Sequence, residues 1–166
     1  MDPTAVAVQL IDGTTVQIRP MSPTDRDALL RFHATLTDET TRLRFFNLHP
    51  HLTPDEVERF THVDHHDREA LVALDGDDII AVGRYDRLPC TDDAEVAFVV
   101  ADGLQGHGIG THLLDQLVQR ARAEGVTRFE ADTLCENHKM RAVFRGSGLL
   151  TTSAIEAGVV HVVLEL

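Results

Sequence analysis

The amino-acid sequence predicts a mixed α+β fold, and three features support this class. Segments with the apolar alternation of β-strands recur along the chain, and segments with apolar residues at helical spacing lie between them. Residues 95–100 are almost wholly apolar, as is typical of a strand at the centre of a sheet. The 166 residues contain no internal repeat and no long linker, so we expect residues 1–166 to form one domain.

The amino-terminal part is expected to form a hairpin and then three helices. Residues 5–11 and 14–18 are strand-like runs joined at an Asp-Gly pair, which is a strong hairpin signal. A Ser-Pro pair then supplies an N-cap and a preset first residue for a helix over residues 23–36. Residues 38–46 predict a shorter helix, and the Thr-Pro-Asp-Glu run from Thr53 starts another.

The middle of the chain predicts a second hairpin, a central strand and a long helix. Residues 69–74 and 79–85 are strand-like runs separated by a stretch dense in Asp and Gly. The run at 95–100 contains a single charged residue and is expected to be buried on both faces. Residues 111–124 place apolar side chains on one helical stripe, and Gly125 ends that helix.

The last third of the chain predicts a strand, a short helix and a closing strand. Residues 127–134 alternate as a strand does, and residues 137–145 are expected to form the helix. The Val-rich residues 158–166 predict the final strand. Exposed edges of the first hairpin and of this closing strand offer surfaces through which a homodimer can pair.

The composition is that of a globular protein with an excess of negative charge. Hydrophobic residues make up 43% and charged residues 25%, and 15 Lys and Arg stand against 27 Asp and Glu, a formal charge of −12. This charge repels a nucleic acid backbone, so we expect no nucleic acid partner. It suits a basic partner such as an amine or a lysine-bearing protein surface, although acidity also serves solubility alone.

The sequence carries no sign of a membrane span or of export. The longest apolar runs, such as residues 96–101, are far shorter than the roughly 20 residues that a membrane helix needs. Cys90 and Cys135 lack a Cys-x-x-Cys spacing, and the first residues do not form a basic and then apolar leader. We therefore expect a reduced, cytoplasmic protein without a membrane partner.

A glycine-rich stretch from Gln105 to Gly110 lies between the central strand and the long helix. The first-turn amides of a helix lack internal partners and carry partial positive charge, which favours an anion. Three glycines at alternate positions let the backbone approach a diphosphate closely, although glycine also serves tight connections for steric reasons alone. The pattern is neither a Walker loop, which needs Gly-Lys-Ser/Thr, nor the Gly-x-Gly-x-x-Gly of dinucleotide sites.

Two segments resemble the GNAT superfamily of N-acetyltransferases. Residues 99–114, VVADGLQGHGIGTHLL, are similar to its acetyl-CoA motif Gln/Arg-x-x-Gly-x-Gly/Ala, and residues 137–149 are similar to its later cofactor helix. The resemblance implies the GNAT fold, a mixed and mostly antiparallel sheet flanked by helices and splayed at its central strands. It also implies acetyl-CoA as cosubstrate, with no metal.

The same resemblance implies roles for individual residues. Backbone amides of Phe98, Val99 and Val100 are expected to pair with the pantetheine arm of acetyl-CoA. Asn137 and Arg145 are expected near the pantetheine and the phosphates. The pyrophosphate is expected on the loop that consists of Gln105, Gly106, His107, Gly108, Ile109, Gly110 and Thr111.

A narrower resemblance concerns the acceptor. Residues 42–46, 59–65 and 94–100 are similar to the catalytic domain of actinobacterial protein lysine acetyltransferases, which favours a lysine-bearing protein as partner. This chain departs from that group because its length leaves no room for a fused sensing domain. It also carries Phe144 where many GNAT enzymes place a Tyr that protonates the leaving thiolate, and Tyr85 is the only tyrosine.

Acetylation of an alkyl amine requires a base, because an amine with a pKa near 10.4 is protonated at neutral pH. Glu95 is the preferred candidate, since a charge within an apolar strand is not needed for solubility, and partial burial raises the pKa of a carboxyl group. The alternative is a strand-edge carboxylate that pairs with Arg84 or Arg87. Glu130 and Asp132 on the next strand rank second, because an exposed strand face explains both.

Other polar and aromatic groups admit simpler interpretations. The histidines and aspartates of residues 62–67, with His49 and His51 nearby, suggest metal ligands, but their spacing fits no closed site and a solvated loop explains them. Cys135 is expected to be a buried structural thiol. Residues 42–46 either shape the entrance for the acceptor or simply pack.

The sequence therefore predicts direct acetyl transfer from acetyl-CoA to a primary amine, most favourably a protein lysine. Glu95 takes the proton of the amine, amides such as those of Val99 or Val100 polarise the thioester carbonyl, and water or the substrate protonates the leaving CoA. Two alternatives stay open. One is an N-acetyltransferase that acts on small-molecule amines, and the other is a catalytically silent module that binds acyl-CoA.

Overall fold

An eight-stranded sheet forms the centre of the protein. The computed structural model describes residues 4–166, and the strands lie side by side in the order β1-β2-β3-β4-β5-β6-β8-β7. Neighbouring strands are antiparallel except for the parallel pair β5 and β6, which confirms the mixed α+β fold class. The strands are β1 (Val6–Gln9), β2 (Thr15–Pro20), β3 (Arg68–Asp75), β4 (Asp78–Arg87), β5 (Asp93–Val100), β6 (Arg128–Leu134), β7 (Thr151–Glu156) and β8 (Val159–Glu165).

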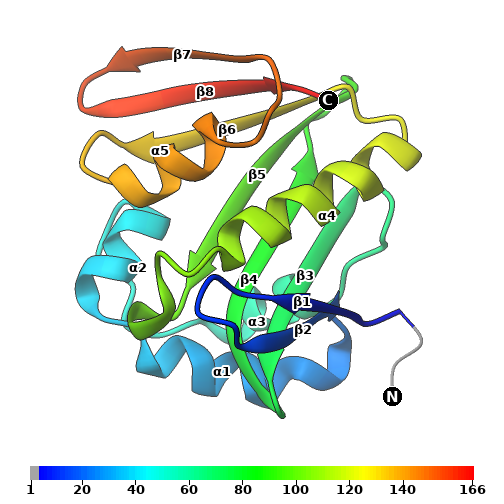
Figure 1. Cartoon of the computed structure of the whole chain (residues 1–166), viewed down its shortest axis with the longest axis vertical. Coiled ribbons are helices and arrows are strands. Elements are labelled where there is room, and N and C mark those ends of the chain that lie inside the picture. Colours follow the sequence, from blue (N-terminus) through cyan, green and yellow to red (C-terminus); the bar gives the residue numbers. More distant parts are fainter. Residues whose placement is uncertain (1–3) are drawn as a thin grey trace.

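Helices cover both faces of the sheet. Figure 1 shows α4 crossing one face, with α1 and α3 behind the other, while α2 and α5 lie near the gap between β5 and β6. None of the helices within residues 4–166 combines the length and apolar character of a membrane-crossing segment. The helices are α1 (Arg26–Thr35), α2 (Asp38–Phe45), α3 (Pro54–Thr61), α4 (Ile109–Ala123) and α5 (His138–Arg145), with short 3-10 turns at Pro23–Asp25 and Asp102–Leu104.

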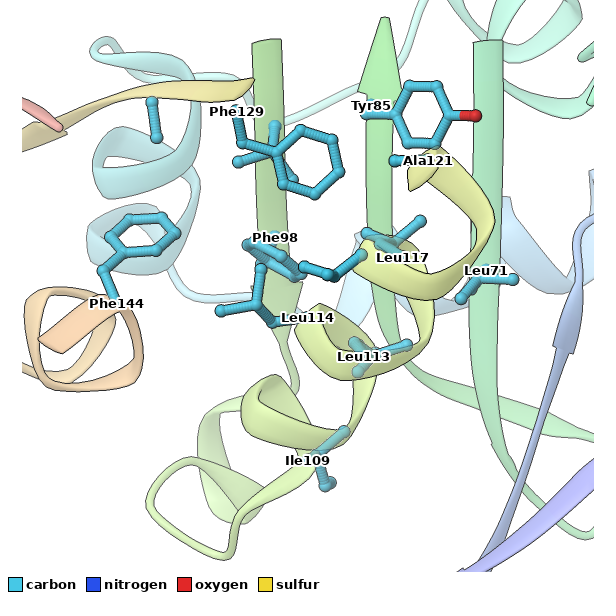
Figure 2. Close-up of a cluster of buried hydrophobic side chains, with 14 of the residues drawn as sticks. Leu71, Tyr85, Phe98, Ile109, Leu113, Leu114, Leu117, Ala121, Phe129 and Phe144 are labelled. Atoms are coloured by element: carbon cyan, nitrogen blue, oxygen red, sulfur yellow. The ribbon is translucent and has the colours of Figure 1, made fainter. Parts of the chain in front are cut away.

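Each face of the sheet has its own hydrophobic core. The larger core lies under α4, where Leu113, Leu114 and Leu117 are almost fully buried and the ring of Phe98 lies beside them (Figure 2). The smaller core lies between β3, β4 and helix α1, and contains Leu29, Phe32, Val72 and Val82 among others. Strand β5 contributes to both cores through alternate residues, so its position is held from both sides.

The start of one helix, the presence of one strand and the burial of another strand differ from the sequence-based predictions. Helix α4 begins at Ile109 rather than Thr111, because Gly108 itself is the N-cap. Strand β7 was not predicted, since all but one of its residues are exposed and no buried alternation reveals it. Strand β5 is not buried on both faces, because Glu95 is exposed and Ala97, Val99 and Val100 are only partly buried.

The partial burial of β5 follows from how its two neighbours pair with it. Strand β4 pairs with β5 along Ala94–Val100, whereas β6 pairs only with Asp93, Ala94 and Glu95. Beyond Glu95 the edge of β5 that faces β6 therefore has no neighbouring strand. This separation of two central strands is the splay that the sequence led us to expect.

Gly83 keeps β4 close to the core under α4, and its replacement tests this packing. A Cβ on Gly83 would lie 2.9 Å from two atoms of the Phe98 ring and 3.2 Å from Leu117 Cδ1. We expect Gly83→Ala to lower the free energy of unfolding by about 1–3 kcal/mol, the usual effect of overpacking a core. Urea denaturation measures this change. Gly103→Ala is the control, because a Cβ there has no neighbour within 4 Å, and equal losses in both variants would contradict the account.

Candidate active site

A cavity of about 670 Å³ occupies the gap where β5 and β6 separate. This volume is within the range of small-molecule and cofactor sites. Its walls come from β5, the loop before α4, the start of α4, helix α2 and helix α5. Ten of the predicted cofactor residues line it: Phe98, Val99, Val100, Gln105, Gly106, Gly108, Ile109, Gly110, Thr111 and Asn137.

The open edge of β5 presents backbone groups to this cavity. The amide of Ala101 donates to the carbonyl of Ile80 at 2.8 Å, so the backbone groups of Ala101 point towards β4. Successive residues of a strand alternate in direction, and the carbonyl of Val100 indeed points the other way, where it accepts from Gln105 Nε2 at 3.2 Å. The amides of Phe98 and Val100 therefore lie on the open edge. The amide of Val99, which we also expected to contact pantetheine and the thioester carbonyl, faces β4 instead, and Val99 lines the cavity with its side chain.

The glycine-rich loop brings backbone amides to the opposite wall. Gly106 and Gly108 have positive φ angles of 83° and 93°, which residues with a Cβ rarely adopt. The first intrahelical bond of α4 runs from the His112 amide to the Gly108 carbonyl at 3.2 Å, so the preceding amides of the helix have no partner within it. With the helix dipole, these amides form an anion-binding wall.

Gly110 is needed for the close packing of α4 and α5 rather than for an unusual backbone conformation. A Cβ at this position would lie 3.3 Å from Val143 Cγ2 of α5, so the missing side chain lets α4 and α5 approach closely. The side chain of Asn137 caps α5 by accepting from the Met140 amide at 3.2 Å. The two helices thus enclose the cavity from adjacent sides, and the cap fixes where α5 begins.

Hydrogen bonds that the Asp102 carboxylate accepts attach helix α2 to the loop before α4. The carboxylate of Asp102 accepts from the hydroxyls of Thr37 at 2.7 Å and Thr40 at 2.5 Å. Although burial opposes the shift, these hydrogen bonds lower the pKa of Asp102. A carboxylate that stays ionised here keeps α2 against the cavity.

Three further side-chain contacts connect the segments that flank the cavity. Gln105 donates to Thr40 at 3.2 Å and accepts from Lys139 Nζ at 3.1 Å. Arg42 of α2 pairs with Glu136 at 2.7 Å, just before α5. Arg42 therefore links α2 to α5, a role that sequence analysis did not assign to it.

Two predicted cofactor residues lie outside the cavity lining. The ring of His107 turns towards the first hairpin, where its Nε2 is 4.0 Å from Asp12 Oδ2, and its carbonyl accepts from the Ile11 amide. Arg145 is an exposed residue at the end of α5. The role of each stays a prediction from the family resemblance. Ile11, by contrast, lines the cavity although sequence analysis did not single it out, and its position at a hairpin tip was the available signal.

Glu95 lies at the last position where β5 and β6 pair. Its register partners are Asp86 on β4 and Glu130 on β6, so three carboxylates share one row of the sheet. The expectation of partial burial is wrong, because Glu95 is exposed. Within residues 4–166 its carboxylate has no ion pair within 4 Å, neither with Arg84 nor with Arg87.

The two rival bases are engaged elsewhere. His161 of β8 lies 3.5 Å from Glu130 Oε2 and 2.7 Å from Asp132 Oδ1. Both carboxylates therefore have a partner that Glu95 lacks. Among these three side chains, Glu95 is the one that is free to receive an external cation.

Neither Phe144, which occupies the position that many GNAT enzymes give to a proton-donating tyrosine, nor Tyr85, the single tyrosine of the chain, lines the cavity. Phe144 is 2% exposed, and its ring packs edge-to-face on Phe98 at 6.2 Å between centroids (Figure 2). Tyr85 is fully buried beside Phe129, on the far side of α4's core, and burial raises its pKa to about 12. Phe144 is thus a core residue of the wall behind the cavity.

The histidine-rich segment makes individual pairs rather than a cluster. His62 lies beside Glu58, His65 beside Glu69, and His66 beside Glu124. In the part of the chain that the structure describes, no three side chains of His, Cys, Asp or Glu come together as metal ligands. Cys135 is partly buried and packs against the larger core.

Comparisons with known proteins add to this geometry. Residues 33–149 match the profile described as the acetyltransferase (GNAT) family. Acetyltransferase Pat of Mycolicibacterium smegmatis is 34% identical over 143 residues, covering 84% of this chain and 43% of that protein. The crystal structure of the GNAT domain of S. lividans PAT has a TM-score of 0.92 at 37% identity, and covers 100% of this chain and 99% of that one.

A third similarity is to a longer protein. The cAMP-binding acyltransferase from Mycobacterium smegmatis has a TM-score of 0.68 at 30% identity, covering 98% of this chain and 47% of that one. This chain therefore spans less than half the length of that protein and of the curated relative.

The glycine loop supplies a test of the anion-binding wall. We expect Gly108→Val to abolish binding of CoA, because its φ of 93° excludes a branched side chain and any relaxation moves the amides that face the diphosphate. Isothermal titration calorimetry with CoA measures the loss. Gly158→Val is the matched control, since Gly158 has a φ of 80° but lies in the hairpin between β7 and β8. Unchanged affinity in a folded Gly108→Val variant would reduce the loop to a connection.

Proposed function

The chain belongs to the acetyltransferase (GNAT) family, and from this premise we propose that it transfers an acetyl group from acetyl-CoA to a protein lysine, with Glu95 as general base. The matches confirm the resemblance found in the sequence. The protein is accordingly an acyl-CoA-dependent N-acetyltransferase with acetyl-CoA as its cosubstrate. The observation that carries the proposal is β5, which has an open backbone edge in the cavity and Glu95 where that edge begins.

The pantetheine arm of acetyl-CoA takes the position of a missing strand in this proposal. Its amides can pair with the backbone of Phe98 and Val100, the groups on the open edge of β5. Such pairing satisfies buried backbone groups that would otherwise need water. The diphosphate lies against the amides at the start of α4. One cavity is lined both by these residues and by β5, so a single ligand can contact the two elements.

The amine arrives on the other side of β5, at Glu95. A lysine ammonium loses its proton to the Glu95 carboxylate, directly or through a water molecule, and its nitrogen then attacks the thioester carbon. The amide of Phe98 or Val100 stabilises the developing oxyanion by donating a hydrogen bond. Collapse of the intermediate breaks the carbon–sulfur bond and forms the amide bond.

The leaving thiolate has no tyrosine within reach. Phe144 stands at the position that many GNAT enzymes give to tyrosine, and its ring is buried in the core. Water or the departing substrate proton therefore neutralises the thiolate in this proposal. The pKa of a thiol, about 8.5, is low enough that a thiolate leaves without obligatory protonation near neutral pH.

Charge supports a lysine as acceptor. Glu95, Glu130 and Asp132 lie on one face of neighbouring strands, and the whole chain carries a formal charge of −12. Such a surface attracts a cationic side chain and repels an acidic one. The similarity of residues 42–46, 59–65 and 94–100 to protein lysine acetyltransferases of actinobacteria agrees with this acceptor.

The assignment of the acceptor is tested by thiol release from acetyl-CoA. The purified protein is assayed with lysine-containing proteins and peptides and with a panel of small amines, including polyamines and amino acids. We expect release with the protein substrates. Release with small amines alone would replace the lysine proposal by a small-molecule N-acetyltransferase, and no release from any mixture would favour a silent acyl-CoA-binding module.

The role of Glu95 predicts the behaviour of Glu95→Gln. We expect turnover near pH 7 to fall by roughly 10² to 10⁴, the range for loss of a positioned base, with acetyl-CoA affinity unchanged. Only the neutral amine attacks, and an alkyl amine has a pKa of about 10.4, so the defect should shrink as pH rises towards 10. Steady-state rates from about pH 6.5 to 10 measure this convergence.

Glu130→Gln is the control for that experiment, because Glu130 is the register partner of Glu95 but already lies beside His161. It should retain most of the turnover. Equal turnover of Glu95→Gln and the parent at pH 7 would rule out the base, and a larger loss in Glu130→Gln would transfer the role to that residue.

A further inference from the structure

Two arginines face a small second pocket that adjoins the large cavity. The pocket has a volume of about 30 Å³ and lies between β4, β5 and helices α1 to α3. Most of its walls are apolar, with Leu29, Phe32 and Phe60 among them. Arg44 of α2 and Arg84 of β4 bring positive charge to this setting. An apolar enclosure of this kind is an unfavourable place for a cation without a counterion.

Arg84 is buried and incompletely hydrogen-bonded. The residue is 5% exposed, and its Nη2 has no hydrogen-bond partner among residues 4–166. Its Nε makes one long contact of 3.4 Å to Asp86 Oδ2, and its guanidinium lies over the ring of Phe60 at 4.6 Å from the centroid. A buried guanidinium nitrogen without a partner is costly, and a ligand oxygen would satisfy it.

The nearby carboxylates do not balance the local positive charge. Asp86 is shared by three guanidinium groups, those of Arg68 at 2.8 Å, Arg84 at 3.4 Å and Arg59 at 3.9 Å. Arg44 has no ion pair within 4 Å among the described residues. Burial lowers the pKa of Arg44 to about 10, and the neighbouring Arg84 adds to this shift against the opposing charges of Glu95 and Asp86.

The excess of cations in this pocket contrasts with the rest of the chain. Arg44 and Arg84 line the pocket, and two further arginines, Arg59 and Arg68, share Asp86 with Arg84, in a protein whose formal charge is −12. Solubility does not require a buried cation such as Arg84, and the contact of its Nε with Asp86 leaves its Nη2 without a partner among residues 4–166. The arrangement is that of a subsite for an anion.

The small pocket shares two lining residues with the large cavity. Arg44 and Val99 line both of them, and Val99 is a residue of the open strand β5. Glu95, where the amine is expected, lines neither. Because the two cavities share Arg44 and Val99, an acyl group bound in the large cavity can extend to the small pocket.

We propose that the small pocket binds the free carboxylate of a dicarboxylic acyl group on CoA, so that the enzyme transfers acyl groups such as succinyl in addition to acetyl. A planar carboxylate suits a guanidinium, which donates two parallel hydrogen bonds. The volume of about 30 Å³ admits a group of this size beside apolar walls. The inference rests on the proposed function, because it assumes that the large cavity holds the acyl-CoA.

The chemistry of transfer is unchanged by the second carboxylate. The amine nitrogen forms a bond to the thioester carbon, the carbon–sulfur bond breaks, and the amine proton passes to Glu95 while CoA leaves as thiolate. The far carboxylate keeps its charge throughout and serves only to position the chain.

The experiment compares succinyl-CoA with butyryl-CoA, whose chain ends in a methyl group where succinyl carries the carboxylate. Calorimetry of the whole chain should show tighter binding of succinyl-CoA. Arg84→Met should weaken succinyl-CoA binding by about 10- to 100-fold, the loss of hydrogen bonds to a charged group, and leave butyryl-CoA binding within about threefold. Arg59→Met is the matched control, because Arg59 also contacts Asp86 but does not line the pocket, and it should change neither affinity.

The outcomes separate this inference from the proposed function. Equal or weaker binding of succinyl-CoA by the unaltered protein would overturn the inference, and this comparison needs no variant to fold. Thiol release with acetyl-CoA is measured alongside with a simple amine. Thiol release from acetyl-CoA, without tighter binding of succinyl-CoA, would support acetyl transfer and refute the subsite. Tighter binding of succinyl-CoA, without thiol release from any acyl-CoA, would support the subsite and refute the transferase.

A further experiment tests whether the carboxylate that binds the small pocket belongs to the amine substrate rather than to the acyl group. Acetyl transfer to an amine that carries a carboxylate is compared with transfer to the matching amide, in the parent and in Arg84→Met. A preference for the carboxylate that Arg84→Met removes would assign the pocket to the acceptor and overturn the acyl assignment. Equal rates for the two amines agree with the proposal.

Discussion

The active site depends on a single interruption of hydrogen bonding in the sheet. Strand β5 keeps β4 as a partner along Ala94–Val100 but loses β6 after Glu95. A strand edge with free backbone groups inside a protein is costly unless something pairs with it. The cavity is thus a consequence of the topology, and a ligand with amide groups of its own is the natural occupant of the edge.

The surrounding helices are held around this open edge and form the walls of the cavity. Gly110 allows α5 to lie against the start of α4, while the Asp102 carboxylate holds α2 on the other side. Along β5 the side chains point above and below the sheet, whereas the backbone amides point sideways to its edges. Phe98 can therefore pack its ring into the core and present its amide to the cavity. On the opposite face, Glu95 marks the approach of the amine, and Arg44 and Arg84 lie beneath the cavity.

Local patterns predicted most of the fold, whereas contacts between distant segments escaped them. The order of strands and helices followed from periodicity, and the glycine loop was found because it is continuous in sequence. Strand β7 was missed because its side chains are exposed. The exposure of Glu95 depends on where β6 diverges from β5, and the placement of Arg44 and Arg84 in one pocket depends on packing α2 against β5, so neither leaves a local signal. An arginine within the otherwise apolar run at 79–85 was the one visible trace.

The central claim is that the open edge of β5 pairs with acyl-CoA, and amide hydrogen exchange followed by NMR tests it most directly. Saturation with CoA should slow exchange of the Phe98 and Val100 amides, which lie on the open edge, and of the first amides of α4. The amides of Ala97 and Val99 should change little, because they already face β4. Bound CoA that leaves the Phe98 and Val100 amides exchanging as before would contradict the account.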